Sequence, residues 1–243
     1  MINYPLNVKI MGKGNKVVLF LHGYGGSMQS FMPVAERIAK NCKVVIVDLY
    51  GFGESLHPNK IMDTYDYAVQ IYLKIKSLGI NVLNIVAHSF GGRIALILAS
   101  LFDLNIDKMV LVGCAGLKPK RTIKYHLKVF LYKLSKKLVK LKLIKPKFLN
   151  RFGSDEYKKL TSYQKRSYVK IVNQDLFYLL KYILTSTLIM WGTKDKSTPI
   201  YMAKKLHKNI INSGVVFYEN GSHFCYLENF VQFCAVLHSF LCN

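Results

Sequence analysis

The surroundings of Ser89 could turn a serine hydroxyl into a nucleophile. Two small residues, Ala87 and Gly91, stand two positions before and after it, where an apolar β-branched run meets an apolar helical segment. Such a strand–turn–helix, a nucleophile elbow, holds the serine in a strained backbone conformation above a sheet. The neighbours have to be small because the turn brings the strand and the helix together. The same short pattern also arises by chance at helix N-termini, so its interpretation depends on the rest of the chain.

A nucleophilic serine needs a general base, and the base needs an acid that orients it. Asp195 follows the apolar run 187–191, and His223 follows the run 215–219. The carboxyl ends of parallel strands meet at one edge of a sheet, so we expect both side chains to lie near Ser89. The order serine, aspartate, histidine along the chain is the order that accompanies a nucleophile elbow. These positions predict a catalytic triad, with Ser89 as nucleophile, His223 as base and Asp195 as acid.

The negative charge that develops on an attacked carbonyl oxygen needs hydrogen-bond donors. The glycine-rich turn 22–26 directly follows the apolar run 17–21, and such a turn can point backbone N–H groups at an oxyanion. In an elbow, the amide after the nucleophile is a further donor, and that residue is Phe90. The predicted chemistry is therefore acyl transfer to water through an acyl-enzyme, which needs no cofactor.

These residues require a sheet whose strands end beside one another. Short apolar, β-branched runs alternate with segments of helical period, a pattern typical of parallel α/β architecture. The runs predict strands at 17–21, 44–47, 82–87, 108–112, 187–191 and 215–219, with an antiparallel edge strand at 7–11. Helices are predicted at 29–40, 63–77, 90–100, 200–208 and 230–241. We expect a mostly parallel sheet of about seven strands with helices on both faces.

One segment, residues 117–185, breaks this alternation. It contains no good buried-strand run, and it holds 19 Lys and Arg against 3 Asp and Glu, which is most of the net charge of +22. We interpret it as a helical cap inserted into a single α/β core, which comprises residues 1–116 and 186–243.

The predicted cap contains a regular leucine pattern. Leucines recur with 4-3-4-3 spacing and form one helical stripe at Leu127, Leu131, Leu134, Leu138 and Leu141. Much of the remaining surface is lysine, at Lys128, Lys133, Lys136, Lys137, Lys140 and Lys142. We expect the stripe to pack over the mouth of the site, with the lysines in water. The alternative is a basic amphipathic surface that meets anionic lipid, as in a lipase or lysophospholipase acting at a membrane.

Composition limits the other functions of the 243 residues. Thirty of the 35 basic residues are lysines and no nucleic-acid-binding module is recognisable, so we expect no nucleic-acid partner. We expect a small-molecule acyl substrate instead, and the positive net charge would suit an anionic one. No residue cluster has metal-ligand spacing and there is no phosphate loop, so neither a metal nor a cofactor is predicted. Five cysteines without paired spacing, no signal peptide and no apolar run of about 18 residues favour a cytoplasmic protein.

Taken together, the motifs resemble the α/β-hydrolase superfamily. They are His22-Gly23 with its glycines, the segment 48–55, the elbow, Trp191-Gly192-x-x-Asp195 and Gly221-x-His223. The likeness covers about residues 15–116 and 186–242, and is greatest to the capped serine hydrolases, both carboxylesterases and carbon–carbon hydrolases. It implies backbone oxyanion donors at Tyr24 and Phe90. It also implies that the loop 48–55 shapes the site and supplies no catalytic carboxylate.

The predicted activity is hydrolysis of a carboxylic ester or thioester. A carbon–carbon hydrolase, or an acyltransferase in which water does not resolve the intermediate, would use the same residues and stays open as an alternative. A non-enzymatic interaction protein on a hydrolase scaffold is disfavoured by the complete set of three residues. The cap matches no pattern that defines a substrate.

Overall fold

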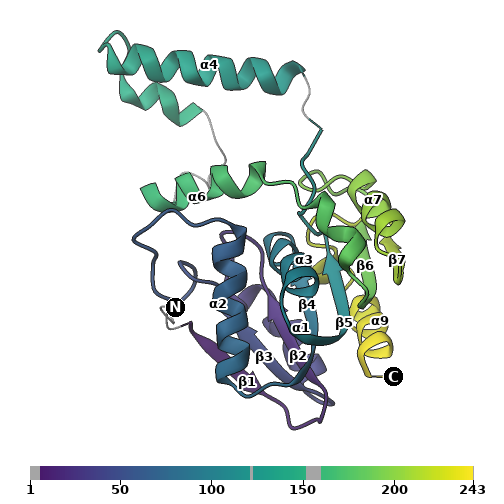
Figure 1. Ribbon diagram of the computed structural model, residues 1–243. Helices are drawn as coiled ribbons and strands as arrows, with labels where there is room; N and C mark the ends of the chain where they lie inside the picture. Colours follow the sequence, from purple (N-terminus) through teal and green to yellow (C-terminus); the bar gives the residue numbers. More distant parts are fainter. Residues whose placement is uncertain (1–5, 121–122, 152–159, 243) are drawn as a thin grey trace.

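The computed structural model describes residues 6–120, 123–151 and 160–242. They form one seven-stranded sheet in the order β1-β3-β2-β4-β5-β6-β7 (Figure 1). β1 pairs antiparallel with β3 at one edge, and the other pairings are parallel. The strands are β1 (Val8–Met11), β2 (Val17–Leu21), β3 (Lys43–Val47), β4 (Val82–His88), β5 (Asn105–Val112), β6 (Ser186–Gly192) and β7 (Ser213–Tyr218). The predicted sheet, including its antiparallel edge strand, is confirmed.

Helices cover both faces of the sheet, which is why the central strands are apolar on both sides. One cluster of buried side chains lies between the sheet and α2 (Thr64–Ser77), α3 (Phe90–Leu101) and α7 (Tyr201–Asn209). The second cluster lies between the opposite face and α1 (Met32–Ile38) and α9 (Phe230–Cys242). Short helical turns complete the core at η1 (Met28–Ser30) and α8 (Cys225–Glu228).

The strand order determines which loops meet. β2 and β4 are neighbours, and β4, β5, β6 and β7 follow one another across the sheet in parallel. The loops at the carboxyl ends of β2, β4, β6 and β7 therefore gather at one edge of the sheet, and these loops carry the residues predicted for the site.

The segment predicted as a cap contains helices and, in its described residues, no strand. They are α4 (Ile123–Lys140), η2 (Pro146–Arg151), α6 (Ser162–Asn173) and η3 (Phe177–Tyr182). η3 belongs to the core rather than to a lid, because it buries Leu179 and Leu180 in the cluster shared with α3 and α7.

α6 is fastened to the core by buried polar contacts. Gln164 donates from Nε2 to the carbonyl oxygen of Gly51 at 2.6 Å, and the amide of Met62 donates to Ser167 Oγ at 2.9 Å. Because Gly51 and Met62 lie within the loop between β3 and α2, these bonds hold this loop and α6 together.

α4 packs differently from the prediction. It lies beyond α6, away from the sheet (Figure 1), and its packing partner in the described part of the chain is η2. Four of the five stripe leucines are exposed, namely Leu127, Leu131, Leu134 and Leu141. The expectation that the stripe packs over the site is therefore wrong. The physical reason is that α6, which is bonded to Tyr24 and Gly51, occupies the position next to the site, and α4 packs against η2 instead.

Candidate active site

Ser89 occupies a sharp turn between β4 and α3. Its backbone has φ 51° and ψ −108°, a conformation that residues with a side chain rarely adopt. The turn is held by hydrogen bonds with the strand next to it: the Ser89 amide donates to Val112 O, and Ala115 N donates to Ser89 O, both at 3.0 Å. A Cβ on Gly91 would lie 2.3 Å from Leu21 O, so only glycine allows α3 to approach β2 this closely. This is the geometry expected of a nucleophile elbow.

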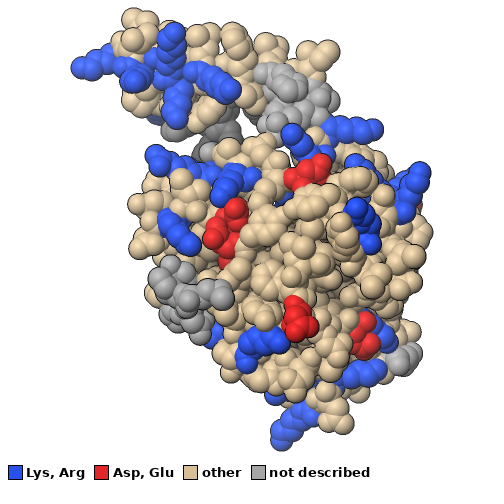
Figure 2. Space-filling view, viewed as in Figure 1, with Lys and Arg blue, Asp and Glu red and all other residues tan. Residues whose placement is uncertain are grey.

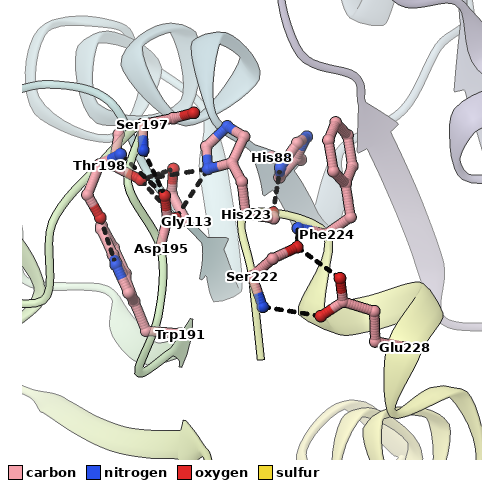
Figure 3. A network of polar contacts seen from close by, with 10 residues as sticks. All are labelled: His88, Gly113, Trp191, Asp195, Ser197, Thr198, Ser222, His223, Phe224 and Glu228. Atoms are coloured by element: carbon pink, nitrogen blue, oxygen red, sulfur yellow. Dashed lines mark hydrogen bonds and ion pairs between the residues drawn. The ribbon is translucent and has the colours of Figure 1, made fainter. Parts of the chain in front are cut away.

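Asp195 lies in the loop after β6, and its side chain is fully buried. Oδ1 accepts hydrogen bonds from the amides of Ser197 at 2.8 Å and Thr198 at 2.9 Å. Oδ2 accepts from Thr198 Oγ1 at 2.8 Å and from His223 Nδ1 at 2.7 Å (Figure 3). Four donors thus surround one carboxylate and fix its orientation.

The charge state of Asp195 follows from two opposing effects. Burial raises the pKa of its carboxyl, but the hydrogen bond and charge of His223, with the hydrogen bonds of Thr198, outweigh burial. The pKa of Asp195 therefore lies below its ordinary value, and the carboxylate is ionised near neutral pH. An ionised carboxylate can only accept hydrogen bonds, so the proton between the two groups lies on Nδ1 of His223.

His223 follows β7 and retains a small exposed fraction of 14%. With Nδ1 protonated, the neutral ring keeps its lone pair on Nε2, the nitrogen that a general base would use. The loop that carries His223 is held by α8, because the Ser222 amide and hydroxyl both donate to the carboxylate of Glu228 (Figure 3).

His88, the last residue of β4, joins the elbow to the loop of His223. It is buried, its Nε2 donates to the carbonyl oxygen of His223 at 2.9 Å, and the two ring centroids lie 4.6 Å apart (Figure 3). Burial, followed by the charge of His223, lowers the pKa of His88 to about 3, so this ring is neutral at physiological pH. Because His88 directly precedes Ser89, this contact brings all three predicted triad residues to the same edge of the sheet.

The predicted oxyanion donors lie next to Ser89. A Cβ on Gly23 would be 3.4 Å from Cβ of Ser89, so the glycine-rich turn after β2 lies against the elbow. Tyr24 is the next residue of that turn, and Phe90 is the first residue of α3; their ring centroids are 5.1 Å apart. The start of α3 adds the positive end of a helix dipole to this region.

The loop 48–55 is held in place by buried polar groups. His22 donates from Nδ1 to Gly23 O at 2.7 Å and accepts at Nε2 from the Leu49 amide at 2.9 Å, so it is a neutral ring. Burial lowers its pKa to about 4. Asp48 accepts from the amides of Met28 at 2.7 Å and Glu54 at 2.9 Å. These bonds occupy the Asp48 carboxylate and agree with a shaping role for the loop.

Two residues of the site were not singled out as functional by the sequence. Thr198 supports Asp195 through both its amide and its hydroxyl, and a hydroxyl residue three positions after an aspartate is a recognisable local signal. His88 offers no such signal. Its partner is a backbone carbonyl 135 residues away, which only the strand order brings near.

The described residues contain no group of three or more His, Cys, Asp or Glu side chains that could hold a metal ion. Among the same residues, no helix is both long and apolar enough to span a membrane.

Known proteins share both the sequence pattern and the fold. Residues 16–129 match the family described as alpha/beta hydrolase fold. The AB hydrolase superfamily protein YisY of Bacillus subtilis is 25% identical over 245 residues, covering 92% of this chain and 90% of that protein. The 2-hydroxy-6-oxo-6-phenylhexa-2,4-dienoate hydrolase of Burkholderia cepacia is 25% identical over 272 residues, covering 99% and 92%.

Among solved structures, an esterase from Exiguobacterium antarcticum superposes with a TM-score of 0.79 at 24% identity, covering 98% of this chain and 96% of that one. The family match over residues 16–129, the seven-stranded sheet and the superposition lead to one conclusion: the chain has the α/β-hydrolase fold.

Proposed function

We propose that this protein is a serine hydrolase that cleaves a carboxylic ester or thioester through an acyl-enzyme on Ser89. His223 accepts the hydroxyl proton through Nε2 as Ser89 attacks the carbonyl carbon, and the ionised Asp195 stabilises the imidazolium. His223 then gives the proton to the leaving group, and a water molecule, activated by the same ring, releases the acid. The observation that carries the proposal is the buried, fully hydrogen-bonded carboxylate 2.7 Å from His223 Nδ1.

The backbone amides of Tyr24 and Phe90 are the proposed oxyanion donors. By analogy with measured cases, one such donor is worth about 3 kcal/mol of transition-state stabilisation. The mechanism uses no metal or cofactor, and the proposed substrate is a small acyl compound in the cytoplasm, with no nucleic-acid partner.

Labelling with a fluorophosphonate tests the nucleophile. The wild type should react once per chain, and Ser89→Ala should abolish both labelling and the turnover of chromogenic esters. Ser100→Ala is the matched control, because Ser100 lies near the other end of α3 and its hydroxyl is bonded to the backbone of Leu96 at 2.7 Å. Labelling that persists in Ser89→Ala would refute the assignment.

A carbon–carbon hydrolase is the second candidate, favoured by the full-length similarity to the hydrolase of Burkholderia cepacia. Both candidates share the three residues, so they are separated by substrate. We would compare esters and thioesters of graded acyl length with 2-hydroxy-6-oxo-6-phenylhexa-2,4-dienoate, and add alcohols to detect acyl transfer. If only the dienoate is turned over, the protein is a carbon–carbon hydrolase and the proposal of ester hydrolysis is wrong. Ester products formed from the added alcohols would identify an acyltransferase.

A further inference from the structure

The helical arm formed by residues 123–151 has a surface that the rest of the described protein does not use. It contains α4 and η2 and lies beyond α6 (Figure 1). Its large apolar side chains are between 42% and 89% exposed at Ile123, Leu127, Phe130, Leu131, Leu134, Leu141 and Leu143. So many exposed apolar residues in 21 consecutive positions of one chain mark an interaction surface.

The two faces of α4 differ in burial. Leu127, Phe130 and Leu134 follow one another at helical spacing and share one exposed face. Tyr132 and Val139 are half-buried on the opposite face, where Ser135 beside them is buried, and on the leucine face only Leu138 of the described leucines is half-buried. The arm therefore packs through the second face and leaves the leucine face outward.

All charged residues of the arm are basic. Its described and exposed lysines are Lys133, Lys136, Lys137, Lys140, Lys142, Lys145 and Lys147. No Asp or Glu occurs between residues 123 and 151, and none of these lysines forms an ion pair with a carboxylate that the structure describes. Figure 2 shows the basic side chains spread over the arm, with the acidic ones confined to the body of the protein in this view.

We propose that this arm docks on the surface of an anionic lipid bilayer, with α4 lying in the plane of the interface. A helix that combines a leucine and phenylalanine face with flanking lysines matches both properties of such a surface. The apolar side chains enter the boundary between headgroups and acyl chains. The lysines extend their ammonium groups to the lipid phosphates. Nucleic acid or an acidic peptide would neutralise the lysines but would leave the apolar face in water.

Sedimentation of the 243-residue protein with vesicles tests this proposal. The vesicles are phosphatidylcholine alone, or phosphatidylcholine with about a third phosphatidylglycerol, at low and at high salt. We expect binding to the anionic vesicles only, weakened by salt because the lysine contribution is screened. Ser89→Ala should bind like the wild type, so that failure of the proposed catalysis and failure of docking are told apart.

Two arm variants and one control separate the contributions. Replacing Lys133, Lys136, Lys137 and Lys140 with glutamine should weaken binding at least ~10-fold, since each lysine near an anionic surface contributes about 1 kcal/mol. Replacing Leu127, Phe130 and Leu134 with glutamine should weaken it by at least as much. The control removes four exposed lysines elsewhere on the protein, at Lys13, Lys40, Lys204 and Lys208. It matches the net charge of the lysine variant and should retain near-normal binding.

The buried Trp191, the one tryptophan of the chain, reports whether each variant keeps its fold. No binding of the wild type to anionic vesicles at low salt would overturn the proposal, as would equal losses in the arm and control lysine variants. Unchanged binding of the leucine-face variant would also overturn it. Self-association of the wild type that this variant abolishes, without vesicle binding, would assign the face to a second copy of the chain instead.

Discussion

Two buried histidines should make the protein sensitive to mild acid. Burial lowers the pKa of His22 to about 4 and of His88 to about 3, from an ordinary value of 6.5. Below pH 6.5 the unfolded chain binds protons at these positions while the folded protein does not. The free energy of unfolding therefore falls as the pH falls from 6.5 towards 4. Between pH 7 and pH 5, each histidine should cost about 2 kcal/mol of stability.

The test is urea unfolding of the wild type and His88→Gln at pH 7, 6 and 5. Glutamine can still donate a hydrogen bond to the carbonyl oxygen of His223 but takes up no proton in this range. The variant should lose about 2 kcal/mol less than the wild type between pH 7 and pH 5. His207→Gln is the matched control, because His207 is exposed, and it should follow the wild type.

Between pH 7 and pH 5, the change in stability that comes from the buried histidines is separate from the contribution of the Asp195 carboxylate. The pKa of Asp195 is lowered from an ordinary value of 3.8, so its contribution to stability is complete above that value and is lost only at lower pH. Equal slopes of stability against pH in the wild type and His88→Gln would show that His88 is not buried in its neutral form. The account given of the contact between His88 and His223 would then be wrong.

Further predictions concern the loops around the site. Asp195→Asn should keep the fold and lower kcat by about 10³- to 10⁴-fold, because an amide favours the wrong tautomer of His223; near-normal ester turnover would refute this. Thr198→Val removes one donor to Asp195 and should lower kcat by about 10-fold, without loss of cooperative unfolding. Gly91→Ala should destabilise the protein by more than ~1 kcal/mol in thermal unfolding, because its Cβ would meet Leu21 O at 2.3 Å; an unchanged Tm would contradict this.

Much of the fold was predictable because each central strand contains a mainly apolar run, broken in β4 only by Asn84. Val17–Leu21 has the bounds that were predicted, and β5 begins at Asn105, three residues before the predicted start. Asn105 and Asp107 are exposed polar positions, so the apolar run could not show that the backbone pairing already begins there.

That Ser89, Asp195 and His223 lie at one edge of the sheet could be predicted, because each follows its own parallel strand. The contacts that orient them could not all be predicted in the same way. His88 is bonded to a backbone carbonyl, and any residue type supplies one, so no residue pattern identifies its partner. For α4 the leucine spacing predicted a helix face correctly. It carried no information on what covers that face, and α6 occupies the position assumed for it.

Tyr24 belongs to the glycine-rich turn and also contacts α6. Its hydroxyl donates to the backbone oxygen of Gln164 on α6 at 2.8 Å, and its ring lies 5.1 Å from that of Tyr168. A displacement of α6 must therefore act on the residue whose amide is the proposed oxyanion donor. In the proposed mechanism, the movement of α6 that admits an acyl group would then be coupled to the alignment of that donor. Under the proposed mechanism, an acyl group that stabilises the position of α6 would also align the proposed donor, so selectivity for that group should be expressed in kcat as well as in KM.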